Sequence, residues 1–370
     1  MKIFKSKNKI IYIAEFSLPN MSAYAVHVLK MCDNFSRFSK VELILPYKKN
    51  KYSFSKIKKD YNLKNKFEIK SVFNSKSILN LFDRIVFALK IKSYVKNTQF
   101  SMIISRSIIP SLILGYYNIK NILEIHTELT GATKCFFKLK NIKNVIKNLK
   151  FIVINFELVK ILGLNNNNTI ILEDAVEAND FKTNNSKKFI EACAYSGSFA
   201  AGKGIEIIYS LAKKSPEIEF HAYGNINTLD KKFKYMSIPK NLHFMGFVSY
   251  NKVTKILPKY KLLLMPYQNK VGVLIKGIDV SKYFSPLKLF EYMASGRPII
   301  ASNLKVYRNI LKHNHNSILL KQNNITAWTI AIKKIMYKKN YSYLGKNAKN
   351  NVKNYSWKLR AQKIIKFYEK

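Results

Sequence analysis

The feature that most constrains the fold is a regular alternation of short apolar runs with stretches of helical periodicity. The runs "KIIYIAEF" and "VELILP" flank a segment in which Ala25, Val28, Leu29 and Cys32 recur at helical spacing. Further strand-like runs follow, with helical stretches between them: "FEIKSV", "SMIISR", "NILEIHT", "FIVIN" and "TIILED". This alternation is typical of an α/β fold, because a helical crossover lets consecutive strands pair in parallel.

The alternation occurs twice, which predicts two domains. An asparagine-rich loop and a linker-like stretch close the first series, which we place in residues 1–182. Residues 183–354 carry a second series, with strands "EACAYSG", "EFHAYG", "LHFMGF", "KLLLMPY" and "PIIAS". The chain then ends in a stretch that we expect to be one basic amphipathic helix. With 370 residues and 48% hydrophobic side chains, the chain can fill two cores, each beside a doubly wound parallel sheet.

The chain is strongly basic, with a formal net charge of +44. Such a charge favours a polyanionic partner: nucleic acid, an anionic membrane or a phosphorylated substrate. Only six of the 65 basic residues are arginine, whereas proteins that read nucleic acids favour the forked guanidinium group. The abundance of lysine and asparagine also fits a chain encoded by an AT-rich genome. Genome composition and attraction to a membrane both stay open as explanations.

Cysteine usage and the short apolar stretches favour a cytoplasmic protein. Cys32, Cys135 and Cys193 lie far apart without the spacing of a metal site, which indicates a reducing compartment. The first apolar run is too short for a signal peptide, and the run around Pro110 is too short to span a bilayer. Residues 134–150 combine six lysines with apolar residues at helical spacing. This segment is either a membrane-surface helix or a helix whose apolar face lies in the core.

Glycines gather where strands of the second series end, which points to a bound ligand. Gly197, Gly224 and Gly246 each follow a predicted strand, where ligands of open α/β sheets bind. Ordinary turn chemistry would also place glycine at some of these positions. In "GKG", Lys203 precedes a helix, so its ammonium group and the helix amides would form an anion site. The spacing excludes a Walker phosphate loop, and the alternative for this residue is a solvated lysine.

The segment "SPLKLFEYMASGRPIIAS" predicts a short helix that contains a single carboxylate. We expect Ser285 to cap the helix, Pro286 to open it and Gly296 to end it. Its buried face should consist of Leu287, Phe290, Met293 and Ala294. Glu291 lies inside the helix, where it could bind ribose hydroxyls of a nucleotide whose phosphates lie at the helix start. The alternative is an exposed glutamate paired with a nearby lysine.

Three segments in this order resemble the donor half of retaining GT-B glycosyltransferases of family 4, the glycosyltransferase group 1 type: "YSGSFAAGKG", "LHFMGFVSYNKVTKILPKYKLLLMPY" and "SPLKLFEYMASGRPIIAS". The first half resembles the acceptor domain of this family, through "PNMSAYAVHVLKMCDNF", "SRSIIPSLILG" and "LEIHT". The resemblance implies two Rossmann-like domains that face a cleft. Residues 1–182 would bind the acceptor and residues 183–354 the donor, with the helix of residues 355–370 packed back on the first domain.

The resemblance also implies roles for single residues. Lys203 matches the lysine that binds the donor diphosphate, and Glu291 matches the second acid of the Glu-x7-Glu motif, which holds the ribose. His126 matches a histidine that faces the transferred sugar, and a histidine that only caps a strand end is the alternative. These three form the implied catalytic set. The implied donor-binding residues are Gly197, Ser198, Lys203, Gly224, Gly246, Phe247, Ser285, Pro286, Leu287, Lys288 and Glu291.

The chain departs from the family pattern in ways that limit these inferences. Tyr283 stands where the first acid of the motif contacts the sugar, so the identity of the sugar cannot be carried over. Ser198 replaces a frequent arginine, which leaves more of the diphosphate charge to Lys203, with help from Lys288 or Arg297. The stretch "PNMSAY" replaces the usual glycine-rich loop after the first strand.

The implied reaction is transfer of a sugar with retention, from a UDP- or GDP-type donor to a hydroxyl of a glycan or lipid-linked glycan, without a metal ion. The implied setting is synthesis of bacterial capsule, lipopolysaccharide or a similar surface polysaccharide, at the cytoplasmic face of the inner membrane. A nucleic-acid-binding protein is a rival that rests on charge alone and leaves the two α/β halves unexplained. A sugar-nucleotide 2-epimerase and a catalytically impaired relative also stay open.

Overall fold

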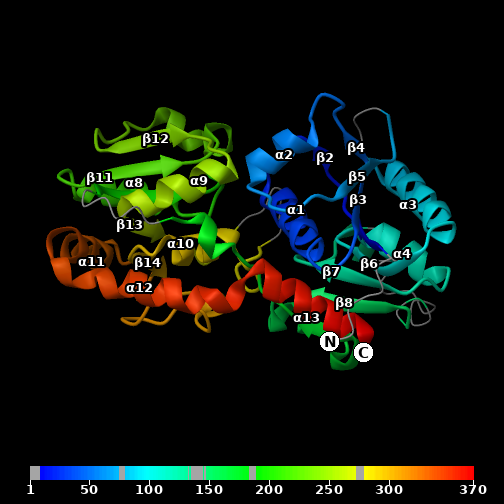
Figure 1. Ribbon diagram of the computed structural model, residues 1–370. Coiled ribbons are helices and arrows are strands. Elements are labelled where there is room, and N and C mark those ends of the chain that lie inside the picture. Colours follow the sequence, from blue (N-terminus) through cyan, green and yellow to red (C-terminus); the bar gives the residue numbers. More distant parts are fainter. Residues whose placement is uncertain are drawn as a thin grey trace. The chain divides into compact units, whose positions relative to one another are not determined.

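The computed structural model describes residues 9–74, 80–131, 133–134, 145, 147–182, 189–271 and 279–370. Cys135 and most of the lysine-rich segment 134–150 lie outside these ranges. The chain divides into two units (Figure 1). Unit 1 comprises Met1–Glu173 and Trp357–Lys370, and unit 2 comprises Asp174–Ser356. Within the described ranges, no helix has both the length and the apolar character needed to cross a bilayer.

The sequence placed the domain boundary after residue 182. The two units divide earlier, after Glu173. Val176 pairs with Ser356 in an isolated parallel bridge. The carbonyl oxygen of Phe181 accepts a hydrogen bond from Nζ of Lys349 at 3.4 Å. These two contacts attach the stretch after Glu173 to unit 2, although its composition resembles a linker.

Unit 1 is built on a parallel sheet of seven strands in the order β5-β3-β1-β6-β7-β8-β9. These strands are β1 Lys9–Ile13, β3 Val41–Leu45, β5 Glu68–Ser71, β6 Phe100–Ser105, β7 Asn121–Ile125, β8 Leu149–Val153 and β9 Thr169–Ile171. All seven apolar runs of the first half therefore form strands. The inner strands are buried on both faces, as their near-continuous apolar sequences require. A short pair, β2 Ser17–Leu18 and β4 Tyr47–Lys48, is too brief to leave a periodic signal.

The helices of unit 1 cover both faces of this sheet (Figure 1). They are α1 Ala23–Phe35, α2 Phe54–Tyr61, α3 Leu81–Lys96, α4 Ile108–Tyr116, α7 Phe156–Leu162 and α13 Trp357–Glu369. α1 contacts α2 and α13, whereas α3 contacts α4. Right-handed crossovers place these two groups on opposite faces, because the chain moves outward through α1 and α2 and back through α3 and α4. Ser22 caps α1 by accepting a hydrogen bond from the amide of Ala25.

Unit 2 has a second parallel sheet, in the order β12-β11-β10-β13-β14-β15. Its strands are β10 Ile190–Ser196, β11 Glu219–Tyr223, β12 Leu242–Gly246, β13 Tyr260–Met265, β14 Ile299–Ser302 and β15 Ile318–Leu320. The five predicted strands are present, and the three-residue β15 was not foreseen. Its helices are α8 Ile205–Lys214, α9 Tyr250–Ile256, α10 Leu287–Ser295, α11 Ile325–Tyr337 and α12 Ser342–Asn351. α8 and α11 pack on one another around the buried Trp328, and with β10, β11 and β13 they form the main core.

The stretch 347–370, expected to be one helix, contains the end of α12 as well as α13, whereas the helix predicted for residues 355–370 is confirmed as α13. α12 ends at Asn351, a 3₁₀ turn covers Val352–Tyr355, and α13 begins at Trp357. Ser356 has an extended backbone between the helices, because it pairs with Val176. The expected return of the last helix is observed: α13 contacts α1, and Nζ of Lys150 donates to the carbonyl oxygen of Phe367 at 2.8 Å.

The start of α10 also differs from the expectation. Pro286 occupies the cap position, and no side chain caps the helix. Ser285 lies one residue before the cap, and its Oγ accepts a hydrogen bond from the amide of Asp174 at 3.1 Å instead. Leu287 is half-buried rather than part of the buried face. The predicted end is confirmed, since Gly296 adopts a left-handed conformation with φ 68°.

Candidate functional site

In unit 2 the sheet grows in opposite directions from β10 and β13. From β10 it extends through β11 to β12, and from β13 it extends through β14 to β15. Ligands of open parallel sheets bind outside the carboxyl ends of the strands at such a switch point. Gly197 directly follows β10, and Pro266 directly follows β13. These two residues mark the edge of the sheet at which the candidate site lies.

Two glycines allow close packing at this edge. At Gly204, which precedes α8 with φ 103°, a Cβ atom would lie 2.2 Å from the carbonyl oxygen of Pro266. At Gly197 a Cβ atom would lie 2.5 Å from Nζ of Lys288. At either position a larger residue would fit only if the neighbouring atoms shifted. Close approach of backbone therefore requires Gly204 of "GKG", whereas at Gly197 the positive φ of 150° is the main constraint, because the end of the Lys288 side chain could move.

Lys203 and Lys288 form a cationic pair around the ring of Tyr267. Their Nζ atoms lie 5.5 Å and 5.0 Å, respectively, from the centroid of that ring. Lys288 is only 8% exposed, and its Nζ also lies 3.7 Å from the ring centroid of Tyr195. Among the described residues this Nζ has no hydrogen-bond partner. A buried ammonium with three unused donors is suited to an anionic ligand.

Burial makes the charged forms of Lys203 and Lys288 energetically unfavourable. It lowers the pKa of Lys203 to about 8. Burial, followed by repulsion from Lys203, holds the pKa of Lys288 well below its usual range, while Glu291 opposes that shift. A bound diphosphate would favour the charged form of both lysines, since an opposite charge nearby stabilises an ammonium.

Glu291 lies on α10, one turn after Lys288, and is half-buried. Burial raises the pKa of Tyr267, and the carboxylate of Glu291 raises it further, which places this acid within electrostatic range of the same ring. Because Lys288 belongs to the first turn of α10 and reaches Gly197, the start of the helix lies at the carboxyl end of β10. The dipole of α10 favours an anion at that end.

The remaining strand-end glycines lie in a row along the same edge. The amide of Gly197 donates to the carbonyl oxygen of Tyr223 at 2.9 Å. The amide of Gly224 donates to the carbonyl oxygen of Gly246 at 3.0 Å. These bonds join the carboxyl ends of β10, β11 and β12, so three of the predicted donor-site glycines are neighbours.

Other candidates of the donor half are exposed, lie at the far end of α10 or are buried. Ser198 is exposed, and its Oγ accepts a hydrogen bond from the amide of Ala200. Phe247 is 55% exposed. Arg297 lies at the far end of α10, where its guanidinium stacks on the ring of Phe189 at 4.3 Å. Lys288 rather than Arg297 therefore supports Lys203. Tyr283 is fully buried, so the position of the missing acid has become part of the core.

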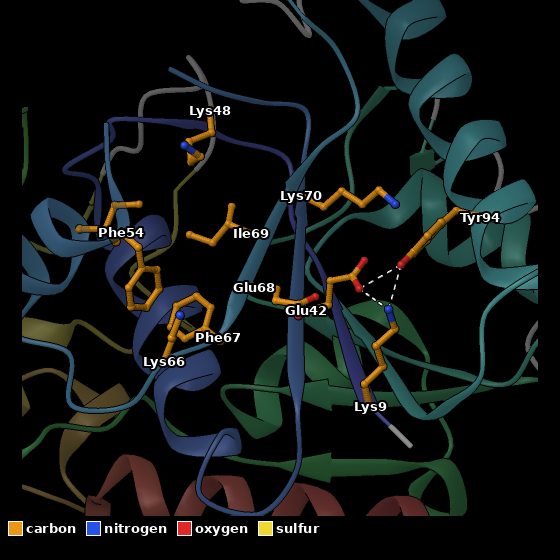
Figure 2. Close-up of a pocket in the computed structure, with 11 residues that line it drawn as sticks. Lys9, Glu42, Lys48, Phe54, Lys66, Phe67, Glu68, Ile69, Lys70 and Tyr94 are labelled. Atoms are coloured by element: carbon orange, nitrogen blue, oxygen red, sulfur yellow. Dashed lines mark hydrogen bonds and ion pairs between the residues drawn. The ribbon is translucent and has the colours of Figure 1, made fainter. Parts of the chain in front are cut away.

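Unit 1 has a hollow of about 510 Å³ beside its edge strand (Figure 2). Within it, Glu42 accepts hydrogen bonds from Lys9 and from the hydroxyl of Tyr94, and Nζ of Lys70 lies over the Tyr94 ring. Lys9 and Glu68 begin β1 and β5, whereas Lys48 and Phe54 follow the carboxyl end of β3, so the hollow extends along the edge of the sheet. None of the predicted site residues lines this hollow.

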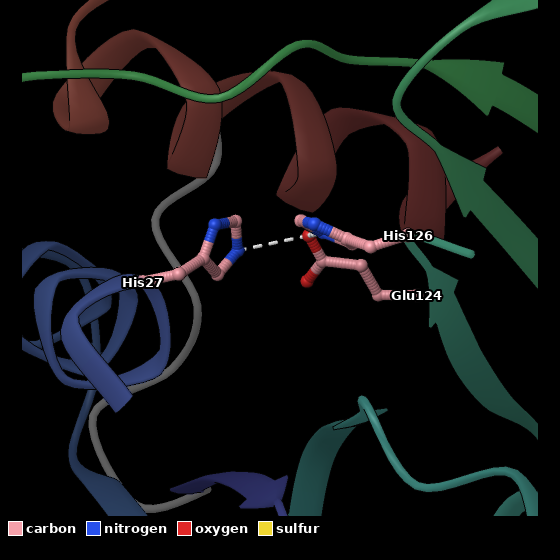
Figure 3. Close-up of side chains that lie close together, drawn as sticks. All are labelled: His27, Glu124 and His126. Carbon is pink, nitrogen blue, oxygen red and sulfur yellow. Dashed lines mark hydrogen bonds and ion pairs between the residues drawn. The ribbon is translucent and has the colours of Figure 1, made fainter. Parts of the chain in front are cut away.

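His126 follows β7 and belongs to a buried cluster centred on Glu124 (Figure 3). Nε2 of His126 lies 2.8 Å, and Nε2 of His27 lies 2.9 Å, from Oε1 of Glu124. Arg360 of α13 donates from Nη2 to the same oxygen at 2.8 Å, and the hydroxyl of Tyr12 donates to Oε2 at 2.9 Å. This network holds the ring of His126 against Glu124 at the carboxyl end of β7.

The cluster carries a balanced pair of charges. Burial alone would raise the pKa of Glu124, but Arg360 and His27 outweigh it and hold that pKa well below its usual range. The side chain of Glu124 is 0% exposed and that of Arg360 is 3% exposed. Full burial of such a pair requires that the carboxylate stays ionised opposite the guanidinium.

The geometry of this cluster disfavours a metal ion, although ligand atoms of His27, Glu124 and His126 lie within 4.8 Å of one another. Arg360 already binds Oε1 of Glu124. A divalent cation at the same oxygen would face a guanidinium in a buried environment, where like charges repel strongly. Arg360 takes the place that a metal would need.

A second group of potential metal ligands lies on the surface of unit 2. Glu219 and His221 belong to β11, and His243 lies opposite His221 on β12. Nε2 of His243 lies 2.6 Å from Oε2 of Glu219, and Nδ1 of His221 lies 2.8 Å from the hydroxyl of Tyr260. This donor set suits a transition metal. The group precedes the strand ends that carry the glycines, so it lies away from the lysine pair.

Several site residues were missed in the sequence. Tyr195 and Tyr267 lie on either side of the switch point, and the signal for both was an aromatic residue at the carboxyl end of a strand. Glu124 was visible as an acid inside the apolar run "NILEI", and Arg360 as one of few arginines in a lysine-rich chain. The contact between Glu124 and Arg360 could not be predicted without the fold.

Comparisons with known proteins agree with this architecture. Residues 176–351 match the family model described as "Glycosyl transferases group 1". A curated relative from Escherichia coli, UDP-Gal:alpha-D-GlcNAc-diphosphoundecaprenol alpha-1,3-galactosyltransferase, is 27% identical over 115 residues. The aligned part spans 30% of this chain and 30% of that relative.

Two solved structures resemble the whole chain. A glycosyltransferase from Rickettsia africae ESF-5 has a TM-score of 0.72 at 12% identity, with 98% of each chain covered. HepE from Anabaena in complex with UDP has a TM-score of 0.70 at 11% identity, with 97% of this chain and 98% of that chain covered. The chain therefore has the two-sheet α/β fold found in GT-B glycosyltransferases, and residues 176–351 are similar to the glycosyl transferases group 1 domain.

Proposed function

We propose that this protein is a retaining, metal-independent glycosyltransferase of family 4, which uses a nucleoside-diphosphate sugar as donor. The observation that carries the proposal is the pair of Lys203 and Lys288 at the switch point of unit 2, with Nζ of Lys288 buried and without a hydrogen-bond partner among the described residues. The match of the surrounding residues to the group 1 family supports it. UDP bound to the similar HepE structure supports a UDP-type donor, and GDP stays the alternative.

In this proposal the donor diphosphate lies between the lysine pair and the start of α10. Both ammonium groups and the helix dipole stabilise the negative charge that develops on the leaving diphosphate. Glu291, one turn into α10, accepts hydrogen bonds from the ribose hydroxyls. Because two lysines supply the positive charge, the reaction needs no metal ion at the diphosphate.

The proposed chemistry exchanges one bond at the anomeric carbon. The bond from this carbon to the diphosphate oxygen breaks, and a bond to the acceptor oxygen forms on the same face. The acceptor proton passes to a phosphoryl oxygen of the departing nucleoside diphosphate. Atoms and charges balance without a further reactant, and the anomeric configuration is retained.

Donor binding tests the role of Glu291. We expect Glu291→Gln to weaken UDP or GDP binding by about 10- to 100-fold, because a hydrogen bond to a charged group contributes about 1.5–3 kcal/mol. Calorimetric titration with each nucleotide would measure this. Glu217→Gln is the matched control, since Glu217 is an exposed acid of unit 2 that pairs with Lys333. Equal nucleotide affinity in wild type and Glu291→Gln would refute the assignment.

Stereochemistry and metal dependence need separate measurements. A product anomer with the configuration of the donor, observed by proton NMR early in the reaction, is the expected result. Full activity after treatment with a chelator is expected as well. An inverted product, or activity that depends on added divalent metal, would overturn these two parts of the proposal while leaving sugar transfer intact.

We further propose that unit 1 meets an anionic membrane, where a lipid-linked acceptor would be found. α3 carries Phe82, which is 72% exposed, and Tyr116 and Tyr117 at the end of α4 are 71% and 41% exposed. Nζ of Lys92 and of Lys96 lie 4.1 Å and 5.4 Å from the ring centroid of Tyr117. Exposed aromatic rings beside lysines suit the headgroup region of an anionic bilayer.

Vesicle sedimentation tests this surface. We expect binding to vesicles that contain phosphatidylglycerol and little binding to neutral phosphatidylcholine vesicles. The double substitution Phe82→Ser and Tyr116→Ser should reduce binding, whereas Tyr235→Ser, at a 90% exposed ring of unit 2, should not. Binding that ignores lipid charge would show that the basic composition reflects the genome rather than a membrane partner.

The proposed setting is synthesis of a bacterial surface polysaccharide at the cytoplasmic face of the inner membrane. It is supported by the Escherichia coli relative, a galactosyltransferase named for a diphosphoundecaprenol-linked acceptor. Deletion of the gene should shorten the glycan by one sugar and lead to accumulation of the unextended lipid-linked precursor. An unchanged surface glycan and lipid pool would exclude this pathway.

A further inference from the structure

One face of the unit 2 sheet carries two histidines and a glutamate side by side at its edge. His221 of β11 lies opposite His243 of β12 in the parallel register, and Glu219 precedes His221 by two residues. Side chains alternate along a strand, so all three point to the same face. Phe220 and Leu242, which alternate with them, belong to the main core. The three polar side chains therefore lie on the face opposite that core.

The ligand atoms of these three residues are close enough for one metal ion. One nitrogen or oxygen atom from each residue lies within 4.8 Å of the other two. Around a tetrahedral zinc ion with bonds of about 2.0–2.2 Å, neighbouring ligand atoms lie about 3.3 Å apart. Nε2 of His243 lies 2.6 Å from Oε2 of Glu219, so zinc binding would separate these two atoms slightly. Their side chains are 44% and 48% exposed, which leaves room for this adjustment.

A buried tyrosine holds the ring of His221 from behind. Nδ1 of His221 lies 2.8 Å from the hydroxyl of Tyr260, which in turn lies 2.7 Å from the hydroxyl of Tyr223. Tyr260 is 1% exposed, so its ring is fixed in the core. Histidines that bind a metal through one ring nitrogen typically donate a hydrogen bond from the other. With Nδ1 donating to Tyr260, Nε2 of His221 carries the lone pair that a metal needs.

Within the described ranges, no lysine or arginine competes with a metal for the carboxylate of Glu219. Its ion pair there is with His243. Glu124 in unit 1 differs, because Arg360 already binds its Oε1 in a fully buried environment. Glu219 and His243 are both exposed, so turning them towards a metal breaks no buried contact. A divalent cation is therefore compatible with the Glu219 group, although it is not compatible with the Glu124 cluster.

We infer that unit 2 has a surface zinc site, in which Nε2 of His221, Nε2 of His243 and a carboxylate oxygen of Glu219 bind one Zn²⁺ ion, with water at the fourth position. Two imidazole nitrogens and one carboxylate oxygen form a ligand set that zinc favours. β12 is the outermost strand of the sheet, so the ion joins this edge to β11. Each histidine precedes the glycine at the end of its strand by three residues, so the ion stabilises unit 2 without meeting the donor.

Titration with zinc alone tests the site. The full-length protein is first treated with a chelator and dialysed, and calorimetric titration with ZnCl₂ should then show one ion bound per chain. His243→Gln and Glu219→Gln should each weaken this binding at least tenfold, because each removes one of three ligands. Both side chains are exposed, so both variants should fold. His315→Gln, at an exposed histidine of unit 2 outside the group, is the matched control. Equal affinity in wild type and His243→Gln, or no zinc binding by wild type, would overturn the inference.

Spectra and thermal unfolding locate the bound ion. In protein with ¹⁵N-labelled histidine, zinc should shift the ring nitrogen signals of His221 and His243 and leave those of His315 unchanged. Zinc at about 100 times its Kd should raise the Tm of unit 2 by about 5 °C in wild type, and by about half as much or less in His243→Gln. Shifts confined to His315, or an equal rise in Tm in His243→Gln, would show that zinc binds elsewhere and contradict the inference. Zinc alone is the probe, so the result does not depend on the proposed sugar transfer.

Discussion

Replacement of Lys203 by methionine should make the unliganded protein more stable and the donor complex weaker. Methionine has an unbranched chain of similar reach, so it can occupy the space beside Tyr267 without a charge. In the wild type, burial lowers the pKa of Lys203 from 10.5 to about 8. The shift of about 2.5 units corresponds to about 3 kcal/mol, at about 1.4 kcal/mol for each unit. This is the free-energy cost of burying the charged ammonium group in the folded, unliganded protein.

The pH dependence follows from the direction of the shift. Below about pH 8 the lysine is charged in both the folded and the unfolded chain, so the full cost acts on the wild type. Between about pH 8 and pH 10.5 the unfolded chain binds more protons than the folded chain, and wild-type stability rises with pH. The advantage of Lys203→Met should therefore be largest at pH 7 and shrink across this window.

Thermal unfolding at pH 7 and pH 9.5 is the direct assay. For a unit of this size, about 3 kcal/mol corresponds to a rise in Tm of about 5–10 °C at pH 7. The control is Lys252→Met, at an exposed lysine of α9, which should change Tm little at either pH. Titration with UDP should show weaker binding to Lys203→Met by at least tenfold. A variant that is no more stable than wild type at pH 7, or whose advantage grows with pH, would refute the reasoning.

Two further substitutions and one truncation test other parts of the structure. Gly204→Ala should lower the free energy of unfolding by about 2–4 kcal/mol in urea titrations, because its Cβ would meet the Pro266 carbonyl, whereas Gly163→Ala, with open space around it, should cost about 1–2 kcal/mol. Ser285→Ala should cost about 1 kcal/mol by the same measurement, since the amide of Asp174 loses its acceptor. Removal of Trp357–Lys370 takes Arg360 from the buried Glu124, so calorimetry should show a lower transition for unit 1, while UDP still binds to unit 2.

Local sequence signals were sufficient for most of the fold. The runs predicted as strands became strands, because a buried parallel strand needs little more than a short apolar run, whereas the apolar run around Pro110 formed helix α4. The elements that were missed are very short: β2 and β4 have two residues each and β15 has three. The break at Ser356 was hidden because a helical pattern continues on both sides of it. Its extended backbone is set by pairing with Val176, a partner far away in the sequence.

The candidate site was predictable to the extent that it depends on backbone features. Glycines at strand ends and the C-terminal end of α10 follow from turn and capping chemistry, which is local. Side-chain partners were less accessible. Ser285 was expected to cap α10, but the amide of Asp174 competes for its hydroxyl. The choice of Lys288 over Arg297 depends on which end of α10 faces β10, and the sequence does not specify this.

Burial, rather than the number of charges, distinguishes the lysines that we assign to the donor. With 65 basic residues, no single lysine stands out in the sequence, and the net charge of +44 is the same whichever lysines bind the donor. Lys203 and Lys288 differ from exposed lysines because burial lowers the pKa of both. The same holds among the acids, where Glu124 is buried against Arg360. A buried charge is costly unless a partner of opposite sign is present. Glu124 has such a partner within unit 1, whereas at Lys288 a hydrogen-bonding partner has to come from outside the described chain, and an anionic donor would supply it.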